Sequence, residues 1–365
     1  MPDLQQTYTA AVVGGCGTWG RYYLRAYAAH PRCRLVALVD QARDRRDAFA
    51  ARYGIGRVHD DVAELLAAGP PDLVSVSLPV AANPDAVIAL ALGGVRAISC
   101  EKPIAVELSE ADEMVRVCRE RGVPLGCGTA CWELPHLLDT VQWVRDGHIG
   151  RLTAAAIPGG LPVEASGAGC VQLTMMRVLT GMEVEWAEGW VEPADASFTG
   201  PSGARPWETD GPAHGRLGLS GGIVCQIPPP PEERRVRCKV SVEGEAGKVW
   251  MGDPSVHVVD TGPEARPVFP EFTQREWDRD FFGPAITRLV TALEAGQQAV
   301  CSGHDYRQAL EIAIALKLSA RDGHQRVQLP LADRRQRLYP HPYRLQGGDV
   351  SGWPGGGYSG PPEVL

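Results

Sequence analysis

Three glycines near the N-terminus, Gly15, Gly17 and Gly20, follow the pattern G-x-G-x-x-G. In a strand-to-helix turn, the first glycine permits the tight turn, the second lets the backbone approach a pyrophosphate, and the third lets the helix pack on the strand. The first turn of such a helix offers unpaired N–H groups and the positive end of the helix dipole to a phosphate. An apolar run over residues 10–13 precedes the pattern and an amphipathic segment over 21–29 follows it. These features predict a phosphate-binding turn.

A carboxylate ends the second predicted strand of the chain. Residues 34–39 are mostly apolar, and Asp40 follows them twenty residues after Gly20. At this spacing, a dinucleotide-binding fold places an acid on the hydroxyls of the adenosine ribose. The glycines and Asp40 together predict a nucleotide-binding βαβ unit.

The segments that must position these residues alternate between strand and helix through the first 127 residues, which is typical of a doubly wound parallel sheet. The predicted strands are 10–13, 34–39, 72–77, 95–100 and 123–127, and the predicted helices are 21–29, 43–53, 62–67, 84–92 and 109–121. Gly54-Ile55-Gly56 is interpreted as a break after the second helix.

The pattern changes in the second half, where successive strands predict an antiparallel sheet with one covered face. The predicted strands are 152–157, 183–191, 215–227, 236–243 and 248–251, and the predicted helices are 133–146, 168–179, 277–295 and 305–320. We therefore expect a dinucleotide-binding domain over 1–128, an α+β substrate and oligomerisation domain over 129–332, and a tail over 333–365. A chain of 365 residues is long enough for two domains.

The tail is rich in glycine and proline from Gly347 to Leu365 and should not form a helix or strand core. It is either disordered or an extended arm whose Trp353 and Tyr358 dock on a neighbour. We favour the docked arm, because disordered tails seldom carry tryptophan.

Composition limits the classes of partner. The net charge of −8 argues against a nucleic-acid partner, and no apolar run approaches the roughly 18 residues that span a bilayer. Met1 to Thr9 is polar and does not resemble a signal peptide. The ten cysteines are scattered, and Cys127 with Cys131 lacks a second pair to complete a zinc site. We therefore expect no metal, buried thiols and a cytoplasmic protein.

The glycine pattern, Asp40, Pro79 and Glu101-Lys102-Pro103 together resemble the Gfo/Idh/MocA family of NAD(P)-dependent oxidoreductases. The segments 242–247, 301–305 and 319–323 also resemble it, so that the likeness covers about Thr9 to Leu331. The resemblance implies a Rossmann domain followed by a domain with a large, mostly antiparallel sheet. It also implies a sugar, cyclitol or related polyol as substrate, and we expect a homo-oligomer, either a dimer or a tetramer.

The resemblance assigns roles to several residues in the first domain. Asp40 would hold the ribose and disfavour a 2′-phosphate, so that NAD is expected rather than NADP, although Arg43 lies close enough to temper that preference. Pro79 would line the nicotinamide ribose, and Glu101 would belong to the cofactor site. The residues expected to contact the cofactor phosphates are Gly15, Gly17, Thr18, Trp19 and Gly20.

Lys102 is the residue that the resemblance places next to the nicotinamide. Its ammonium could polarise a carbonyl or exchange a proton with a hydroxyl, and burial there would lower its pKa. The alternative is a surface lysine paired with Glu101. We predict the catalytic role.

The chain departs from the family at its second catalytic element. The family's Asp-x-x-x-His pair aligns with Gly167 and Val171, neither of which can carry a proton, and Gln172 is the nearest polar side chain. Trp132 could stack on a sugar ring or be a core tryptophan. The candidates for a replacement acid or base are Glu164, His136, Asp210 and His214.

Two classes of function remain open from the sequence. The first is an NAD(H)-dependent oxidoreductase, or a lyase or hydrolase that uses NAD for a transient oxidation. The second is a non-catalytic sensor that binds a dinucleotide or a sugar. Lys102 favours the first class and the missing pair favours the second. We predict the oxidoreductase, with a sugar-like small molecule as its substrate.

Overall fold

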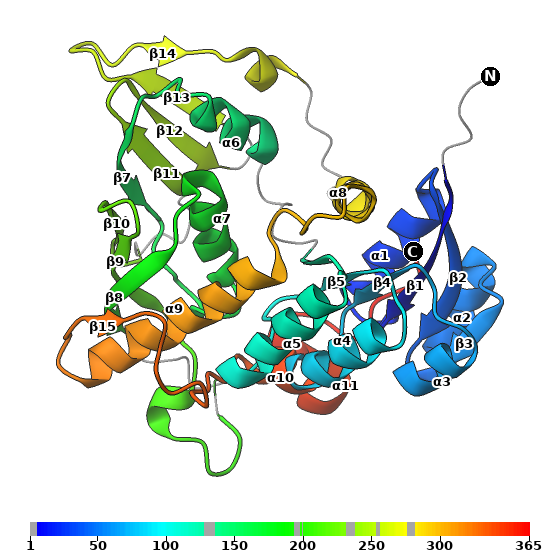
Figure 1. Cartoon of the computed structure of the whole chain (residues 1–365). Coiled ribbons are helices and arrows are strands. Elements are labelled where there is room, and N and C mark those ends of the chain that lie inside the picture. The colour runs from blue at the N-terminus through cyan, green and yellow to red at the C-terminus, as the bar shows by residue number, and fades with distance from the viewer. Residues whose placement is uncertain are drawn as a thin grey trace. The chain divides into compact units, whose positions relative to one another are not determined.

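The computed structural model describes residues 6–127, 136–192, 198, 200–230, 238–252, 256–275 and 282–365. The chain divides into two compact units (Figure 1). The first unit consists of Met1–Thr129, Asp280–His304 and Pro342–Leu365, and the second of Ala130–Arg279 and Asp305–His341. This division assigns two segments, 280–304 and 342–365, to the first unit, whereas the sequence placed them in the second domain and in the tail.

The first unit contains a six-stranded sheet with the order β3-β2-β1-β4-β5-β6, in which all neighbouring strands are parallel. This confirms the predicted Rossmann sheet. The strands are β1 (Tyr8–Val13), β2 (Cys33–Val39), β3 (Arg57–His59), β4 (Leu73–Val76), β5 (Ala97–Cys100) and β6 (Leu125–Gly126). Sequence reasoning missed β3, because three residues are too few to show a period of two.

Helices connect these strands in the order that the sequence predicted. They are α1 (Gly20–Ala29), α2 (Arg43–Tyr53), α3 (Val62–Ala67), α4 (Asn83–Leu92) and α5 (Leu108–Glu120). The bounds of α2 and α3 agree with the prediction. Helix α2 ends at Gly54, whose φ of +66° is the left-handed conformation that glycine adopts without steric cost.

Helix α8 (Phe282–Ala295) packs on α1 in the first unit. Phe282 contacts Tyr23 edge-on, with ring centroids 4.9 Å apart, and stacks on Tyr22 at 5.4 Å. The apolar face of α8 is buried in the same core cluster as β1 and α1. Burial of this face accounts for the assignment of a sequence-distant helix to the first unit.

The C-terminal segment, defined here as residues 342–365, also folds onto the first unit. It forms α10 (Pro342–Gln346), α11 (Gly348–Ser351) and a 3-10 turn at Trp353–Gly356. Tyr343 stacks on Tyr358, with centroids 5.1 Å apart, and meets the Trp353 ring edge-on at 5.8 Å. The segment is thus an ordered arm, as favoured from its tryptophan, but it docks on its own chain.

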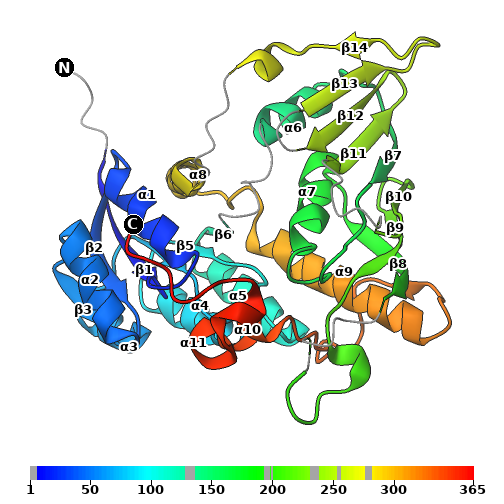
Figure 2. The same cartoon turned by 180° about the vertical axis from the view of Figure 1, so that it is seen from behind.

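The second unit is built on a nine-stranded sheet, seen from behind in Figure 2. Its order is β14-β13-β12-β11-β7-β10-β9-β8-β15, and β7 and β10 are parallel while the other neighbours are antiparallel. This confirms the predicted mostly antiparallel sheet. The strands are β7 (Leu152–Ala156), β8 (Val184–Val191), β9 (Ala213–Leu219), β10 (Val224–Ile227), β11 (Cys238–Gly244), β12 (Gly247–Gly252), β13 (Val256–Asp260), β14 (Pro267–Val268) and β15 (Val327–Gln328).

One strand prediction in this unit was wrong. Residues 215–227 form a hairpin of β9 and β10 instead of one strand. The chain reverses at Gly222, whose φ is +76°. Two successive glycines, Gly221 and Gly222, marked this turn in the sequence.

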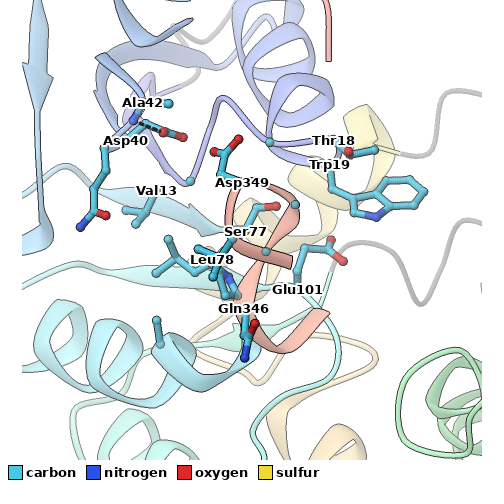
Figure 3. A pocket seen from close by; sticks show the side chains of 18 of the residues that line it. Val13, Thr18, Trp19, Asp40, Ala42, Ser77, Leu78, Glu101, Gln346 and Asp349 are labelled. Carbon is cyan, nitrogen blue, oxygen red and sulfur yellow. Dashed lines mark hydrogen bonds between the residues drawn. The ribbon is translucent and has the colours of Figure 1, made fainter. Parts of the chain in front are cut away.

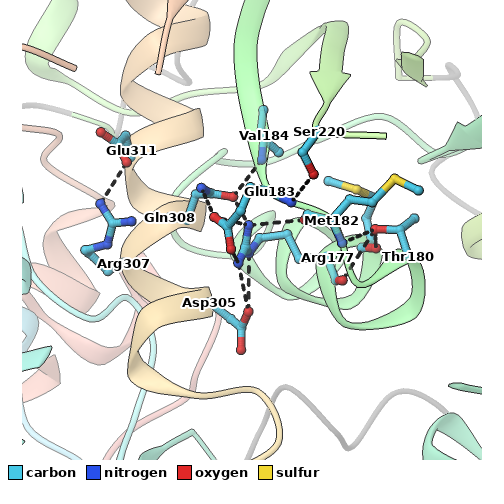
Figure 4. A network of polar contacts seen from close by, with 11 residues as sticks. Arg177, Thr180, Met182, Glu183, Val184, Ser220, Asp305, Arg307, Gln308 and Glu311 are labelled. Atoms are coloured by element: carbon cyan, nitrogen blue, oxygen red, sulfur yellow. Dashed lines mark hydrogen bonds and ion pairs between the residues drawn. The ribbon is translucent and has the colours of Figure 1, made fainter. Parts of the chain in front are cut away.

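Helix α7 (Cys170–Thr180) contacts α6 (Leu137–Arg145) and the strands β7 and β11. Its Arg177 is buried and donates to Glu183 and to Asp305 on α9 (Gly303–Arg321), with shortest distances of 2.8 and 3.2 Å (Figure 4). Arg177 also bonds Gln308, one turn along α9. These bonds fix α7 against α9.

We predict that Arg177→Leu lowers the free energy of unfolding by about 2–3 kcal/mol, because several hydrogen bonds from a buried charged group are lost. Urea denaturation measures the change. Arg151→Leu removes the exposed ion pair with Glu245 and serves as the control, with an expected change of about 0–1 kcal/mol. Equal losses in the two variants would contradict this assignment.

Candidate functional site

The turn after β1 brings three backbone segments into close contact. Gly14 has a φ of +75°, and a Cβ there would lie 2.3 Å from the Ser77 carbonyl oxygen. A Cβ at Gly20 would lie 2.2 Å from the Gly14 oxygen, so α1 packs directly on the turn as the sequence predicted. Gly14, with its positive φ, makes the tight turn, whereas the sequence assigned that role to Gly15. Gly15 is instead required by packing, because a Cβ there would lie 2.3 Å from Cδ1 of Leu38.

Gly17 differs from its neighbours because it is not closed in by packing. The nearest atom to a Cβ at this position would be the Gly14 oxygen at 3.5 Å, an ordinary contact. Gly17 is partly exposed and lines a cavity together with Thr18 and Trp19. The backbone here is therefore open to close approach by a ligand, next to the N-terminus of α1.

Asp40 is held in a fixed orientation at the end of β2. Its Oδ2 accepts the backbone N–H of Cys16 and its Oδ1 accepts that of Ala42, each at 2.9 Å. A carboxylate offers about four acceptor positions, so both oxygens can still accept bonds from hydroxyl groups. Asp40 lines the cavity, as its predicted role on a ribose requires.

The cavity measures about 420 Å³ and lies entirely in the first unit, which is within the range of small-molecule sites. Figure 3 shows Asp40 and Ala42 on one side of it and Trp19 and Glu101 on the other. Among the expected cofactor residues, those that line it are Gly17, Thr18, Trp19, Asp40, Pro79, Glu101 and Lys102. Gly15 and Gly20 do not line the cavity, and both are closed in by the packing of the turn.

Lys102 lies at the other end of the cavity, after β5. It is partly exposed, and its Nζ is 5.9 Å from the centroid of the Trp19 ring, which is within cation–π range. The peptide bond from Lys102 to Pro103 is cis. The side chain that the sequence singled out for proton transfer thus reaches the cavity that Asp40 also lines.

Buried hydrogen bonds fix the backbone around Lys102. The Glu101 carboxylate is 5% exposed and accepts a 2.6 Å bond from the Tyr23 hydroxyl. Burial, followed by the charge of Glu101, raises the pKa of Tyr23 well above its usual value. Asn83, on α4, donates to the carbonyl oxygens of Glu101 and Pro103. Sequence reasoning noted no role for Asn83 or Tyr23, because these contacts cross between segments.

The arginine near Asp40 that lines the cavity is Arg45 and not Arg43. Arg43 is mostly exposed and pairs with Asp60. Arg45 lies two residues further along α2 and pairs with Asp349 of the C-terminal segment at 2.5 Å. Sequence distance alone could not identify Asp349, which is 304 residues away.

In the second unit, the positions aligned with the family's acid and histidine carry no proton-transferring group. Val171 is 3% exposed at the start of α7. A Cβ at Gly167 would lie 1.8 Å from Oε1 of Glu164, whose side chain is buried. The Glu164 carboxylate therefore fills the space into which a side chain at position 167 would extend.

Both carboxylate oxygens of Asp210 are occupied by hydrogen bonds within the protein. Its two oxygens accept backbone bonds from Ala165, Ser166 and Gly211 at 2.8–2.9 Å, and the Ser166 hydroxyl donates at 2.7 Å. Burial, and then the charge of Glu164, raise the pKa of Asp210 to about 6. These bonds give Asp210 a role in holding the loop.

The remaining candidates of the second unit lie in different settings. His214 stacks on Trp190, with centroids 5.8 Å apart, and burial lowers its pKa. His136 has a φ of +56° and contacts the Phe272 ring. Gln172 is 9% exposed, and its Oε1 accepts no hydrogen bond from any described residue. Trp132 lies outside the described residues, and its role stays a prediction.

The described cysteines form no disulfide. Seven of the eight thiols whose side chains are described are buried, and Cys33 is partly buried. Burial, and then the charge of Asp40, raise the pKa of Cys16, which disfavours the thiolate form at this position in the glycine turn. In the described part of the chain, no three metal-binding side chains come together and no helix is long and apolar enough to cross a membrane.

Comparison with known proteins agrees with this geometry. Residues 9–129 match the Gfo/Idh/MocA family, described as an oxidoreductase family with an NAD-binding Rossmann fold. The chain is 34% identical over 136 residues to D-apiose dehydrogenase of Paraburkholderia graminis, covering 37% of this chain and 36% of that protein. It is 28% identical over 154 residues to inositol 2-dehydrogenase of Rhizobium meliloti, covering 41% and 46%. The matched regions thus span less than half the length of these curated relatives.

The fold is also that of a solved dehydrogenase. Levoglucosan dehydrogenase in complex with NADH has a TM-score of 0.71 to this chain at 17% identity, over 89% of this chain and all of that one. At this identity the likeness shows the fold alone. The family match confirms the predicted resemblance and an NAD-binding Rossmann fold over residues 9–129, and the shared fold confirms the predicted architecture.

We predict that Gly17→Ala weakens NADH binding by about tenfold or more, because a methyl group would enter the space where the backbone is open to a phosphate. The free energy of unfolding should stay within about 0.5 kcal/mol of wild type. Gly20→Ala is the matched comparison, and it should destabilise the fold by about 1–3 kcal/mol through overpacking. Calorimetric titration and urea denaturation measure the two effects. Unchanged NADH affinity in Gly17→Ala would contradict the assignment.

A second prediction concerns the second unit. Gly167→Asp should lower the free energy of unfolding by about 3 kcal/mol or more, because the new carboxylate would be buried against that of Glu164. Gly56→Asp is the control, since nothing lies within 4 Å of a Cβ there, and its change should stay within about 0.5 kcal/mol. A Gly167→Asp protein as stable as this control would show that Glu164 does not fill the space.

Proposed function

We propose that the chain is an NAD(H)-dependent oxidoreductase of the Gfo/Idh/MocA type, acting on a sugar, cyclitol or related polyol, with Lys102 as its acid/base; the match of residues 9–129 to that family supports this. The observation that carries the proposal is the cavity of the first unit. It is lined at one end by the fixed carboxylate of Asp40 and at the other by Lys102. These residues meet the two needs of such an enzyme, which are to hold a dinucleotide and to move a proton.

The residues present fit NAD(H). Gly17 leaves the backbone open next to the N-terminus of α1, where a pyrophosphate is favoured. Asp40 keeps acceptor positions for the two hydroxyls of an adenosine ribose, and its charge opposes a 2′-phosphate. When bound, the nicotinamide supplies the acceptor or donor for a hydride.

Lys102 would carry the proton that accompanies this hydride. In the oxidation direction, the Lys102 amine takes the proton of the substrate hydroxyl, and in the reduction direction its ammonium returns a proton to the carbonyl oxygen. Asn83 donates to the backbone carbonyl groups on both sides of Lys102, and Tyr23 bonds the neighbouring Glu101 carboxylate, which supports a fixed position for Lys102.

The substrate class is supported by the relatives. D-apiose dehydrogenase and inositol 2-dehydrogenase are, by their names, dehydrogenases of a sugar and a cyclitol. Gln172 stays a predicted substrate residue; its buried amide oxygen accepts no bond from the described residues.

One observation favours a second candidate, a sensor that binds NAD(H) without turnover. Gly167 and Val171 offer no acid or base, and Asp210 is occupied by structural bonds. General acid–base help contributes a factor of about 10²–10⁴, so its partial loss slows turnover.

NAD-dependent elimination or hydrolysis at Lys102 is a further variant of the enzyme. Product analysis after incubation with sugars and cyclitols separates these from the sensor, which leaves every compound unchanged.

We predict that Lys102→Arg lowers kcat by at least about 100-fold, because a guanidinium keeps the positive charge but does not release its proton near neutral pH. NADH affinity should remain within a few-fold of wild type, since the charge is retained. Steady-state assays over a panel of sugars and cyclitols, with calorimetric titration of NADH, measure the two quantities. Activity that survives in Lys102→Arg would overturn the acid/base role.

A further inference from the structure

The C-terminal segment forms one wall of the nucleotide cavity. The Tyr343 hydroxyl donates to Oγ1 of Thr18 at 2.8 Å, beside the glycine turn. Gly347 lies against Pro79, where a Cβ would be 3.1 Å from the proline Cγ. Helices α10 and α11 thus pass over the ends of β1 and β4, and a nucleotide in the cavity would lie against them.

Asp349, on α11, faces the adenosine end of this cavity through Arg45. Their ion pair joins Nη2 and Oδ2 at 2.5 Å, and both residues line the cavity together with Asp40. Trp353 orients the pair, because its Nε1 donates to the other oxygen of Asp349 at 3.2 Å and its ring centroid is 6.0 Å from the Arg45 guanidinium. Arg45 Nε is buried and makes no bond to a described residue.

The neighbouring arginines of α2 are occupied elsewhere. Arg43 and Arg46 both pair with Asp60, and Asp60 also lines the cavity. Arg45 is therefore the α2 guanidinium that lines the cavity itself. A guanidinium near the ribose acid is the group that accommodates a 2′-phosphate in NADP-binding sites.

We propose that Asp349 is a determinant of cofactor choice: by pairing with Arg45 it withholds this guanidinium from an adenosine 2′-phosphate, so that the C-terminal segment favours NAD(H) over NADP(H). The inference rests on the proposed function, because it requires a dinucleotide in the cavity. It adds to the role of Asp40, which opposes the same phosphate by its own charge. Selectivity thus depends on one acid that follows β2 and one from the C-terminal segment.

Asp349→Asn tests the proposal with little structural change. The asparagine Oδ1 can still accept the bond from Trp353 Nε1, while the charge that holds Arg45 is removed. We expect the affinity ratio for NADPH over NADH to rise by about tenfold or more, since Arg–phosphate bonds are charge-assisted. NADH affinity should change by less than about threefold. The titrations should be run at low ionic strength. The side chains of Arg45 and Asp349 are 24% and 54% exposed, so salt screens their ion pair.

Three further variants test whether the change in the affinity ratio depends on Arg45. Glu363→Gln removes one charge from the same segment at a residue that does not line the cavity, and it should leave the ratio unchanged. Arg45→Ala/Asp349→Asn should lose the gain in NADPH affinity, because the guanidinium responsible is absent. Asp40→Ser should raise the ratio without any change at Arg45, and so provides a positive control.

The outcomes separate the inference from the proposed function. Wild-type protein that binds neither NADH nor NADPH would overturn the proposed function. Wild-type protein that binds NADH, with an unchanged ratio in Asp349→Asn, would overturn only the role of Asp349. A gain that persists in Arg45→Ala/Asp349→Asn, or that appears equally in Glu363→Gln, would show a general charge effect and would also overturn it.

Discussion

The contact of α1 with the turn after β1 is the constraint on which the nucleotide-binding unit depends. A Cβ at Gly14, Gly15 or Gly20 would lie only 2.2–2.3 Å from a neighbouring atom, so these three positions have room only for glycine. This packing leaves Gly17 facing the cavity and aims the Cys16 N–H at Asp40. One steric requirement therefore places both the open phosphate-binding backbone and the ribose acid.

The opposite end of the cavity is held by hydrogen bonding instead of by close packing. Tyr23 on α1 bonds the Glu101 carboxylate, and Asn83 on α4 bonds the backbone on both sides of Lys102. Phe282 of α8 packs on the Tyr23 ring. A segment from much later in the sequence thus supports the residues that position the proposed acid/base.

Local patterns predicted the parts of the fold that local physics determines. The alternation of strand and helix segments predicted the parallel sheet, and the spacing from Gly20 to Asp40 predicts where a dinucleotide would lie. Sequence spacing could not predict contacts between distant segments, and so the roles of Arg45, Asn83 and Asp349 became visible only in the fold. The hairpin at Gly222 was missed because apolar residues continue on both sides of a two-glycine turn.

The catalytic half of the site was less predictable for a related reason. Alignment identified Gly167 and Val171 as residues without a proton to transfer, but it could not show that Glu164 fills the space beside Gly167. Nor could it distinguish Asp210, whose oxygens are bound by four donors, from an available acid. Burial and hydrogen bonding decide which carboxylate is structural, and both depend on the tertiary fold.

The central claim is that the cavity of the first unit holds one dinucleotide per chain, between Asp40 and Lys102. A crystal structure of the protein with NADH tests it most directly. The account predicts one NADH in each chain, with its adenosine ribose on Asp40, its pyrophosphate over Gly17 and its nicotinamide next to Lys102. NADH bound elsewhere on the chain, or bound in this cavity with its nicotinamide away from Lys102, would contradict it.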